Sequence, residues 1–116
     1  MFGRGKEKIE GPISPAEAKS RIDEFKPFAI IDVRERADYE KEHISEAICV
    51  QFSEFKVEVA KSLKKDEENI LYDSGDGLAQ KAAEQLLKWG FENVKVMEGG
   101  LVAWRAAGFP IKQGFF

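Results

Sequence analysis

Short apolar runs that alternate with helical patterns are the feature that most constrains the fold of this chain. Three such runs, 28–33, 47–50 and 70–72, are largely hydrophobic and lack the polar alternation of a half-exposed strand. This pattern is typical of strands buried on both faces of a parallel sheet. A fourth strand is expected at 94–97. Because helical segments separate the runs, the sequence predicts an α/β fold, with a central, mostly parallel sheet flanked by helices.

Helix signals fall between the apolar runs. Residues 14–17 form a capping box with proline at the first helical position, and Ser53 is expected to cap a second helix. The longest helix is predicted from about 77 to 89, where Gly90 can supply a left-handed cap. Each helix has an apolar face that is expected to pack on the sheet: Ala18, Ile22 and Phe25; Phe55, Val59 and Leu63; Leu78, Ala82, Leu86 and Trp89.

Size and composition indicate one globular domain. The 116 residues, 43% of them hydrophobic, are enough for a single core. The net charge is −3 and no basic run exceeds Lys64-Lys65, so nucleic acid is not an expected partner. No apolar run approaches the roughly 18 residues of a membrane span, and the N-terminus lacks the apolar stretch of a secretory signal. The single cysteine, Cys49, excludes an internal disulfide and favours a reducing, cytoplasmic location.

Asp73 is the most informative residue for function, because it ends the third apolar run. The chain then turns through Ser74-Gly75-Asp76-Gly77 into the longest predicted helix. A strand end, a glycine-containing turn and a helix N-terminus bring free backbone N–H groups together, which makes an anion-binding site. Here the site carries two aspartates. Ligands of parallel sheets bind beyond the carboxyl ends of the strands, so we expect Asp32, Asp73 and the turn at 98–100 to line one pocket.

Two motifs lie in opposite halves of the chain. The N-terminal one consists of Ile31-Asp32-Val33-Arg34, Tyr39-Glu40, His43-Ile44 and Ala47, and the C-terminal one is the stretch 97–104 followed by 108–110. These motifs, and the spacing between them, resemble the two signatures of the rhodanese-like domain family. The resemblance covers roughly residues 9–112, which leaves 1–8 as an N-terminal extension and 113–116 as a tail. It implies a rhodanese-like three-layer α/β fold.

The resemblance also implies where an active site would lie. In active family members the loop after the fourth strand runs roughly Cys-x-x-Gly-x-Arg, and its cysteine carries sulfur as a persulfide. Lys-Ala-Ala at 81–83 matches the helix that follows this loop and sets the alignment without a gap. Asp73 then stands at the cysteine position, Asp76 at the glycine position and Leu78 at the arginine position. Glu46 stands where the first signature usually has glycine.

These departures predict that rhodanese-type sulfurtransferase activity is absent. Sulfur transfer needs a thiolate, whereas a carboxylate cannot form a persulfide. Two unit charges about 5 Å apart at an effective dielectric near 20 repel by roughly 3 kcal/mol, so Asp73 and Asp76 would each oppose an anionic substrate. We therefore expect a catalytically inactive domain without a cofactor, acting as a binding or regulatory module. The expected partner is a protein that contacts the loop around Asp73 or the neighbouring surface.

Alternative roles exist for Asp73 and Cys49. Asp73 can accept N–H bonds from its own loop, where the helix dipole favours a negative charge by about 0.3–1 kcal/mol. The alternatives are a general base, or a metal ligand together with Asp76 and Asp32, although no metal ion is expected. Cys49 can be a small core residue or a relocated sulfur carrier, and a sulfurtransferase could also use a partner's cysteine. In each case the sequence favours the structural role.

The remaining polar residues of the first signature are also interpreted as structural. No cysteine or serine partner is placed beside His43 by a motif, so we expect it to position a loop by bonding to backbone. By resemblance, Asp32 and Arg34 are expected to form polar contacts at a strand end.

Overall fold

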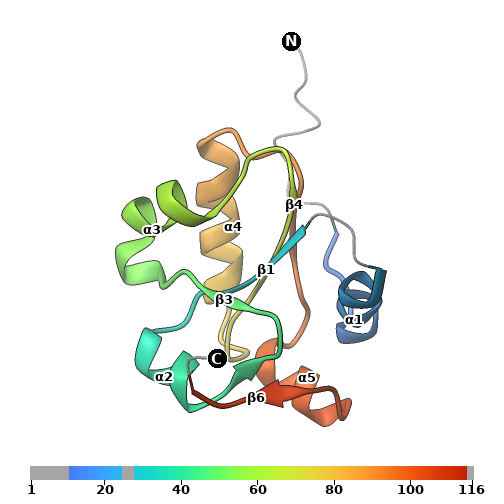
Figure 1. The fold of residues 1–116 in the computed structure, drawn as a ribbon. Coiled ribbons are helices and arrows are strands. Elements are labelled where there is room, and N and C mark those ends of the chain that lie inside the picture. The colour runs from blue at the N-terminus through green and yellow to red at the C-terminus, as the bar shows by residue number, and fades with distance from the viewer. Residues whose placement is uncertain (1–10, 25–27, 115–116) are drawn as a thin grey trace.

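The computed structural model describes residues 11–24 and 28–114, and these form a central parallel sheet between two layers of helices (Figure 1). The strand order is β3-β1-β4-β5, and each neighbouring pair is parallel. The predicted α/β fold with a central parallel sheet is therefore confirmed. The strands are β1 (Phe28–Asp32), β3 (Ile48–Cys49), β4 (Glu68–Tyr72) and β5 (Val94–Val96).

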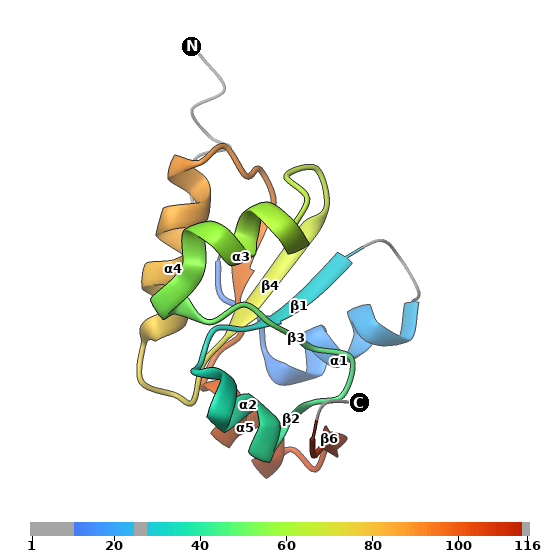
Figure 2. The ribbon, with the colours of Figure 1, turned by 60° about the vertical axis from the view of Figure 1, so that its left-hand side comes forward.

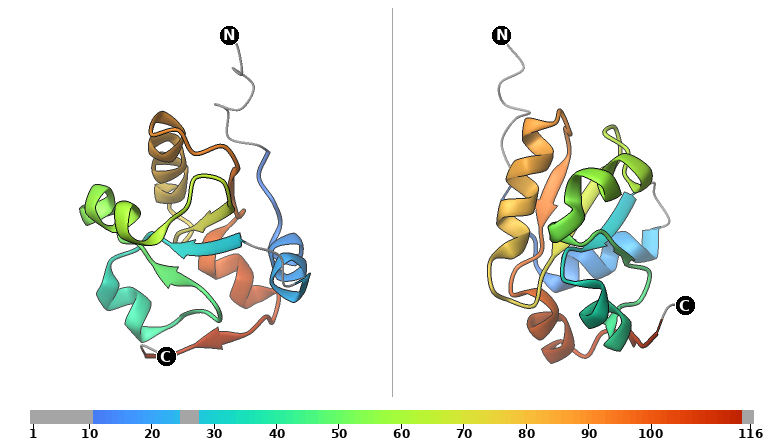
Figure 3. Two further views of the ribbon diagram at one scale, coloured as in Figure 1. Left: turned by 45° about the horizontal axis from the view of Figure 1, so that its top comes forward. Right: turned by 90° about the vertical axis from the view of Figure 1, so that its left-hand side faces the viewer.

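Helices cover both faces of the sheet, as the turned views in Figures 2 and 3 show. Side chains alternate between the two faces along each strand, so Ile30 and Tyr72 join one core cluster while Ile31 and Leu71 join the other. The first cluster packs against α1 and α5, and the second against α3 and α4. These helices are α1 (Pro15–Glu24), α3 (Phe55–Ser62), α4 (Leu78–Lys88) and α5 (Gly100–Ala106).

The predicted capping signals at two helix ends are confirmed. Ser14 N–H donates to Glu17 Oε1 at 2.8 Å, and Glu17 N–H donates to Ser14 Oγ at 3.1 Å, which is the reciprocal pair of a capping box. Helix α4 ends at Lys88, and Gly90, which follows the C-cap Trp89, has a φ of +93° in the left-handed region. These contacts join residues close in sequence, so the sequence contains the information that forms them.

Two sequence predictions need correction. Ser53 does not cap α3, because a 3-10 turn (Phe52–Glu54) precedes this helix and shifts its start; the Ser53 hydroxyl donates to Glu35 Oε1 at 3.3 Å instead. The strand predicted at 47–50 is only two residues long and lies at the edge of the sheet, so Ile48 is 37% exposed. The prediction for Phe25 lies outside the described residues.

A small antiparallel pair was not predicted. It joins β2 (His43–Ile44), which follows helix α2 (Arg36–Lys41), to β6 (Ile111–Lys112). Strands of two residues leave no periodic pattern in the sequence. Past β6, Gly114 N–H donates to the carbonyl of Glu40 at 2.7 Å. Within the described ranges, no helix is long and apolar enough to cross a membrane.

Candidate functional site

Residues 73–78 form a loop that we call the acidic loop, and the Asp73 carboxylate is buried within it. Asp73 is 5% exposed, although residues 74–77 above it are exposed. Its Oδ1 accepts the N–H of Gly75 at 2.8 Å, and its Oδ2 accepts those of Gly77 at 3.1 Å and Ala79 at 2.9 Å. A buried carboxylate needs such donors to offset the loss of water. The backbone donors at this helix N-terminus are thus bound to a side chain of the same chain.

Asp76 differs from Asp73 although both belong to the acidic loop. Asp76 is exposed, and its Oδ1 accepts one N–H, from Leu78 at 3.3 Å. The two carboxylates bind different amides. In the part of the chain that the structure describes, no group of three or more His, Cys, Asp or Glu residues could hold a metal ion.

The turn before α5 packs directly on the acidic loop, and the two lie side by side in Figure 1. The N–H of Leu101 donates to the carbonyl of Asp73 at 2.8 Å. A Cβ on Gly100 would lie 2.5 Å from the Asp73 carbonyl oxygen and the Gly75 nitrogen, and 2.7 Å from Asp73 Oδ1. Only glycine fits at position 100 without displacing this backbone.

Asp32 lies at the carboxyl end of β1 but points away from the acidic loop. It pairs in register with Tyr72, and the Tyr72 hydroxyl donates to Asp32 Oδ2 at 2.7 Å. Because successive residues face opposite sides of a sheet, Asp73 points to the other face. The expected single pocket containing Asp32 and Asp73 is therefore not formed.

Arg34 completes a buried network around Asp32. Its Nη2 donates to Asp32 Oδ2 at 2.7 Å and to the carbonyl of Glu42 at 2.6 Å. The Tyr72 hydroxyl in turn accepts the N–H of Ile44 at 3.0 Å. Burial, and then the charge of Asp32, raise the pKa of Tyr72, so its hydroxyl stays protonated. Sequence reasoning missed Tyr72; the one signal was that a buried tyrosine hydroxyl needs a partner.

His43 lies in β2, and within the described residues its side chain forms no hydrogen bond with the acidic loop. It is 2% exposed, and its ring stacks on Tyr39 with centroids 3.8 Å apart. Its Nδ1 shares a hydrogen bond with the carbonyl oxygen of Tyr39 at 2.8 Å. This contact with backbone is of the kind expected for a positioning residue.

Cys49, the single cysteine, lies in the edge strand β3 and is 9% exposed. Its Sγ contacts the carbonyl oxygen of Arg34 at 3.9 Å. Burial is the main cause that raises the pKa of this thiol to about 11. The group is therefore protonated near neutral pH, whereas sulfur chemistry requires the thiolate.

Comparison with known proteins gives consistent matches. The model of the rhodanese-like domain family matches residues 14–107. The uncharacterized protein YibN of Escherichia coli K12 is 32% identical over 87 residues, which cover 73% of this chain and 61% of that protein. Protein HIGH ARSENIC CONTENT 1, mitochondrial, of Arabidopsis thaliana is 32% identical over 90 residues, covering 68% of this chain and 53% of that protein. This chain thus spans about half to three-fifths of these relatives' length.

Two solved structures illustrate the structural similarity. The Alr3790 protein from Anabaena sp. is 32% identical, with a TM-score of 0.82, and the match covers 89% of this chain and 93% of that one. Thiosulfate sulfurtransferase from Pseudomonas aeruginosa is 27% identical, with a TM-score of 0.83; the match covers 90% of this chain but 20% of that protein.

Proposed function

This chain belongs to the rhodanese-like domain family, and we propose that it is a catalytically inactive member that acts as a protein-binding or regulatory module. The proposal rests on the alignment that the resemblance implies, in which Lys-Ala-Ala at 81–83 matches the helix of active members and Asp73 corresponds to the sulfur-carrying cysteine. The observation that carries the proposal is the set of three N–H bonds to the Asp73 carboxylate.

The chemistry of the loop supports inactivity. Loop amides and a helix N-terminus would stabilise a thiolate or an anionic sulfur donor. Here they stabilise a carboxylate, which cannot carry sulfane sulfur. Asp76 adds a second negative charge, and Leu78 provides no cation at the position where active members have arginine.

A sulfurtransferase that uses Cys49 is the alternative from the enzyme class. The burial of Cys49 and its raised pKa argue against it, because the reacting sulfur must be both exposed and ionised. A second alternative, metal binding at the acidic loop, is disfavoured because three N–H bonds already occupy three of the roughly four lone-pair sites of the Asp73 carboxylate. A sulfurtransferase that borrows a partner's cysteine would still lack the free amides.

The binding role follows from a retained fold whose loop lacks the reactive group. Residues 74–77 are exposed at the carboxyl end of the sheet and are available to a protein partner. The single free cysteine accords with the reducing cytoplasm.

A thiosulfate:cyanide sulfurtransferase assay tests the proposal. We expect wild type and Cys49→Ser to give the same background rate. The triple variant Asp73→Cys, Asp76→Gly, Leu78→Arg serves as a positive control, because it restores the family's loop chemistry on the same scaffold, and its rate should exceed that background. Wild-type turnover well above that of Cys49→Ser would overturn the proposal.

A further inference from the structure

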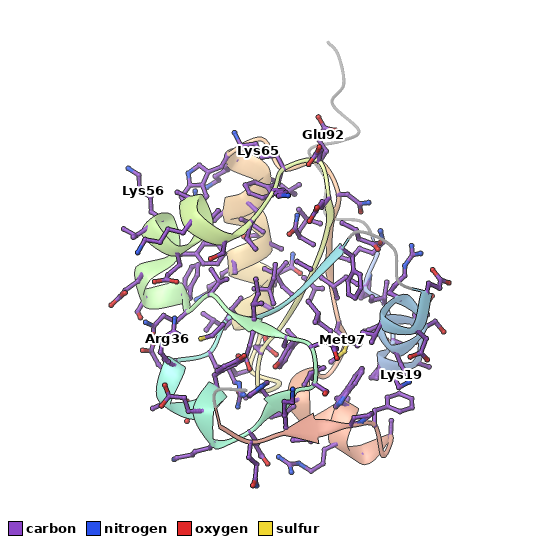
Figure 4. The ribbon with its side chains drawn as sticks, in the orientation of Figure 1. Lys19, Arg36, Lys56, Lys65, Glu92 and Met97 are labelled. Carbon is purple, nitrogen blue, oxygen red and sulfur yellow. The ribbon has the colours of Figure 1, made fainter. Side chains whose placement is uncertain are left out.

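A groove at the opposite end of α4 from the acidic loop takes no part in the site described above. It lies between α3 and the residues that follow α4, and its volume is about 410 Å³. Figure 4 shows Lys56 and Lys65 at this end of the molecule, beside α3 and α4. We call it the lysine groove; it is lined by Lys56, Val59, Ala60, Leu63, Lys65, Trp89 and Phe91.

The floor of the lysine groove is part of the hydrophobic core. Val59 and Phe91 are 5% and 4% exposed and belong to the core cluster under α3 and α4. Leu63 and Trp89 are partly buried against the same cluster. The Trp89 ring also stacks on Phe55, with centroids 5.9 Å apart. The floor is therefore a fixed apolar surface that suits an aliphatic or aromatic side chain.

The charged residues that line the groove are all basic. Among the described residues, neither Lys56 nor Lys65 has an ion-pair partner, whereas the nearby acids Glu58 and Glu67 pair with Arg36 and Lys64. The Lys65 side chain lies over Gly90, since a Cβ at Gly90 would be 3.6 Å from Lys65 Nζ. A chain of net charge −3 thus presents two unpaired ammonium groups beside an apolar floor.

We propose that the lysine groove binds an acidic amphipathic segment of a partner protein. A leucine-sized side chain of that segment fills the apolar floor, and flanking carboxylates pair with Lys56 and Lys65. A small molecule is less suited, because small-molecule sites fix their ligand with polar groups inside the pocket, and here the polar groups are two lysines. The inference rests on the proposed role as a protein-binding module and assigns the contact to a face away from the acidic loop.

The test uses a blocked twelve-residue peptide with two leucines four positions apart and glutamates between and beside them. Tryptophan fluorescence measures its affinity at low salt, and amide chemical shifts locate its site. We expect shifts at residues 56–65 and 89–92. The variant Lys56→Glu/Lys65→Glu should bind at least tenfold more weakly. The control Lys81→Glu/Lys112→Glu carries the same charge change on exposed residues outside the groove. It should bind within about threefold of wild type, which excludes a purely nonspecific effect of net charge.

Four results would overturn the inference. The first three are equal weakening by both charge-reversed pairs, equal binding of a peptide with glutamine in place of glutamate, and no binding at millimolar peptide. The fourth is a set of chemical-shift changes confined to residues 73–78, which would refute the groove yet leave the binding role of the domain intact. Sulfurtransferase turnover, by contrast, would refute inactivity without affecting the groove.

Discussion

Replacing Asp73 with asparagine tests the central feature of the acidic loop, because it keeps the shape of the side chain and removes its charge. The amide oxygen can take the place of Oδ2 and keep two N–H partners, but the amide NH2 then faces the N–H of Gly75. One hydrogen bond is lost and its donor is left unpaired, which costs about 1 kcal/mol at the lower end of the usual range, since this loop is near water.

The two remaining bonds also become weaker. Bonds to a charged acceptor contribute about 1.5–3 kcal/mol, whereas neutral ones contribute about 0.5–1.5 kcal/mol, so each loses about 1 kcal/mol. The expected total loss for Asp73→Asn is therefore about 3 kcal/mol of unfolding free energy. With a urea m-value of about 1–3 kcal/mol/M for a small protein, the unfolding midpoint should fall by roughly 1–3 M.

The matched control is Asp76→Asn, which makes the same chemical change in the same loop. Asp76 is exposed and accepts one longer bond, so its substitution should cost less than about 0.5 kcal/mol. Urea unfolding followed by circular dichroism measures both. If Asp73→Asn stays within 0.5 kcal/mol of wild type, on the order of an ordinary surface change, or if both variants lose the same stability, the three N–H bonds do not hold the loop.

Three further predictions concern the residues around the acidic loop and the sheet. Gly100→Ala should lower the thermal midpoint more than Gly108→Ala. Both positions have positive φ, but a Cβ at 108 meets nothing within 4 Å, whereas one at 100 would collide with backbone at 2.5 Å. Equal shifts of the two midpoints would contradict this reasoning. Tyr72→Phe should cost about 1–3 kcal/mol in urea unfolding, because it leaves the N–H of Ile44 buried without its acceptor, and an unchanged midpoint would disprove it. Folding raises the pKa of Cys49 from 9.0 to about 11, so the protonated thiol stabilises the fold fully below about pH 9, and this contribution is lost as the pH rises toward 11. Wild type should therefore lose unfolding free energy relative to Cys49→Ser over that interval. Parallel pH profiles of the two proteins would count against this prediction.

The sequence by itself determined the features that depend on near neighbours in the chain. The capping box joins Ser14 to Glu17, and the partners of the Asp73 carboxylate all lie within six residues of it. Apolar runs identified strands β1 and β4, because burial on both faces of a sheet requires uninterrupted hydrophobic residues. The predicted role of Asp73 as an acceptor for its own loop could thus be reasoned without a fold.

Only the tertiary structure decided which strand ends share a site. The pairing of Asp32 with Tyr72 turns Asp32 to the opposite face from Asp73. The steric requirement at Gly100 exists only because the turn before α5 meets the acidic loop. The lysine groove likewise joins residues 56–65 to 89–91. Local hydrogen bonds and periodic hydrophobicity are written into neighbouring residues, whereas strand pairing and close backbone contact depend on segments far apart in the chain, whose meeting no local pattern specifies.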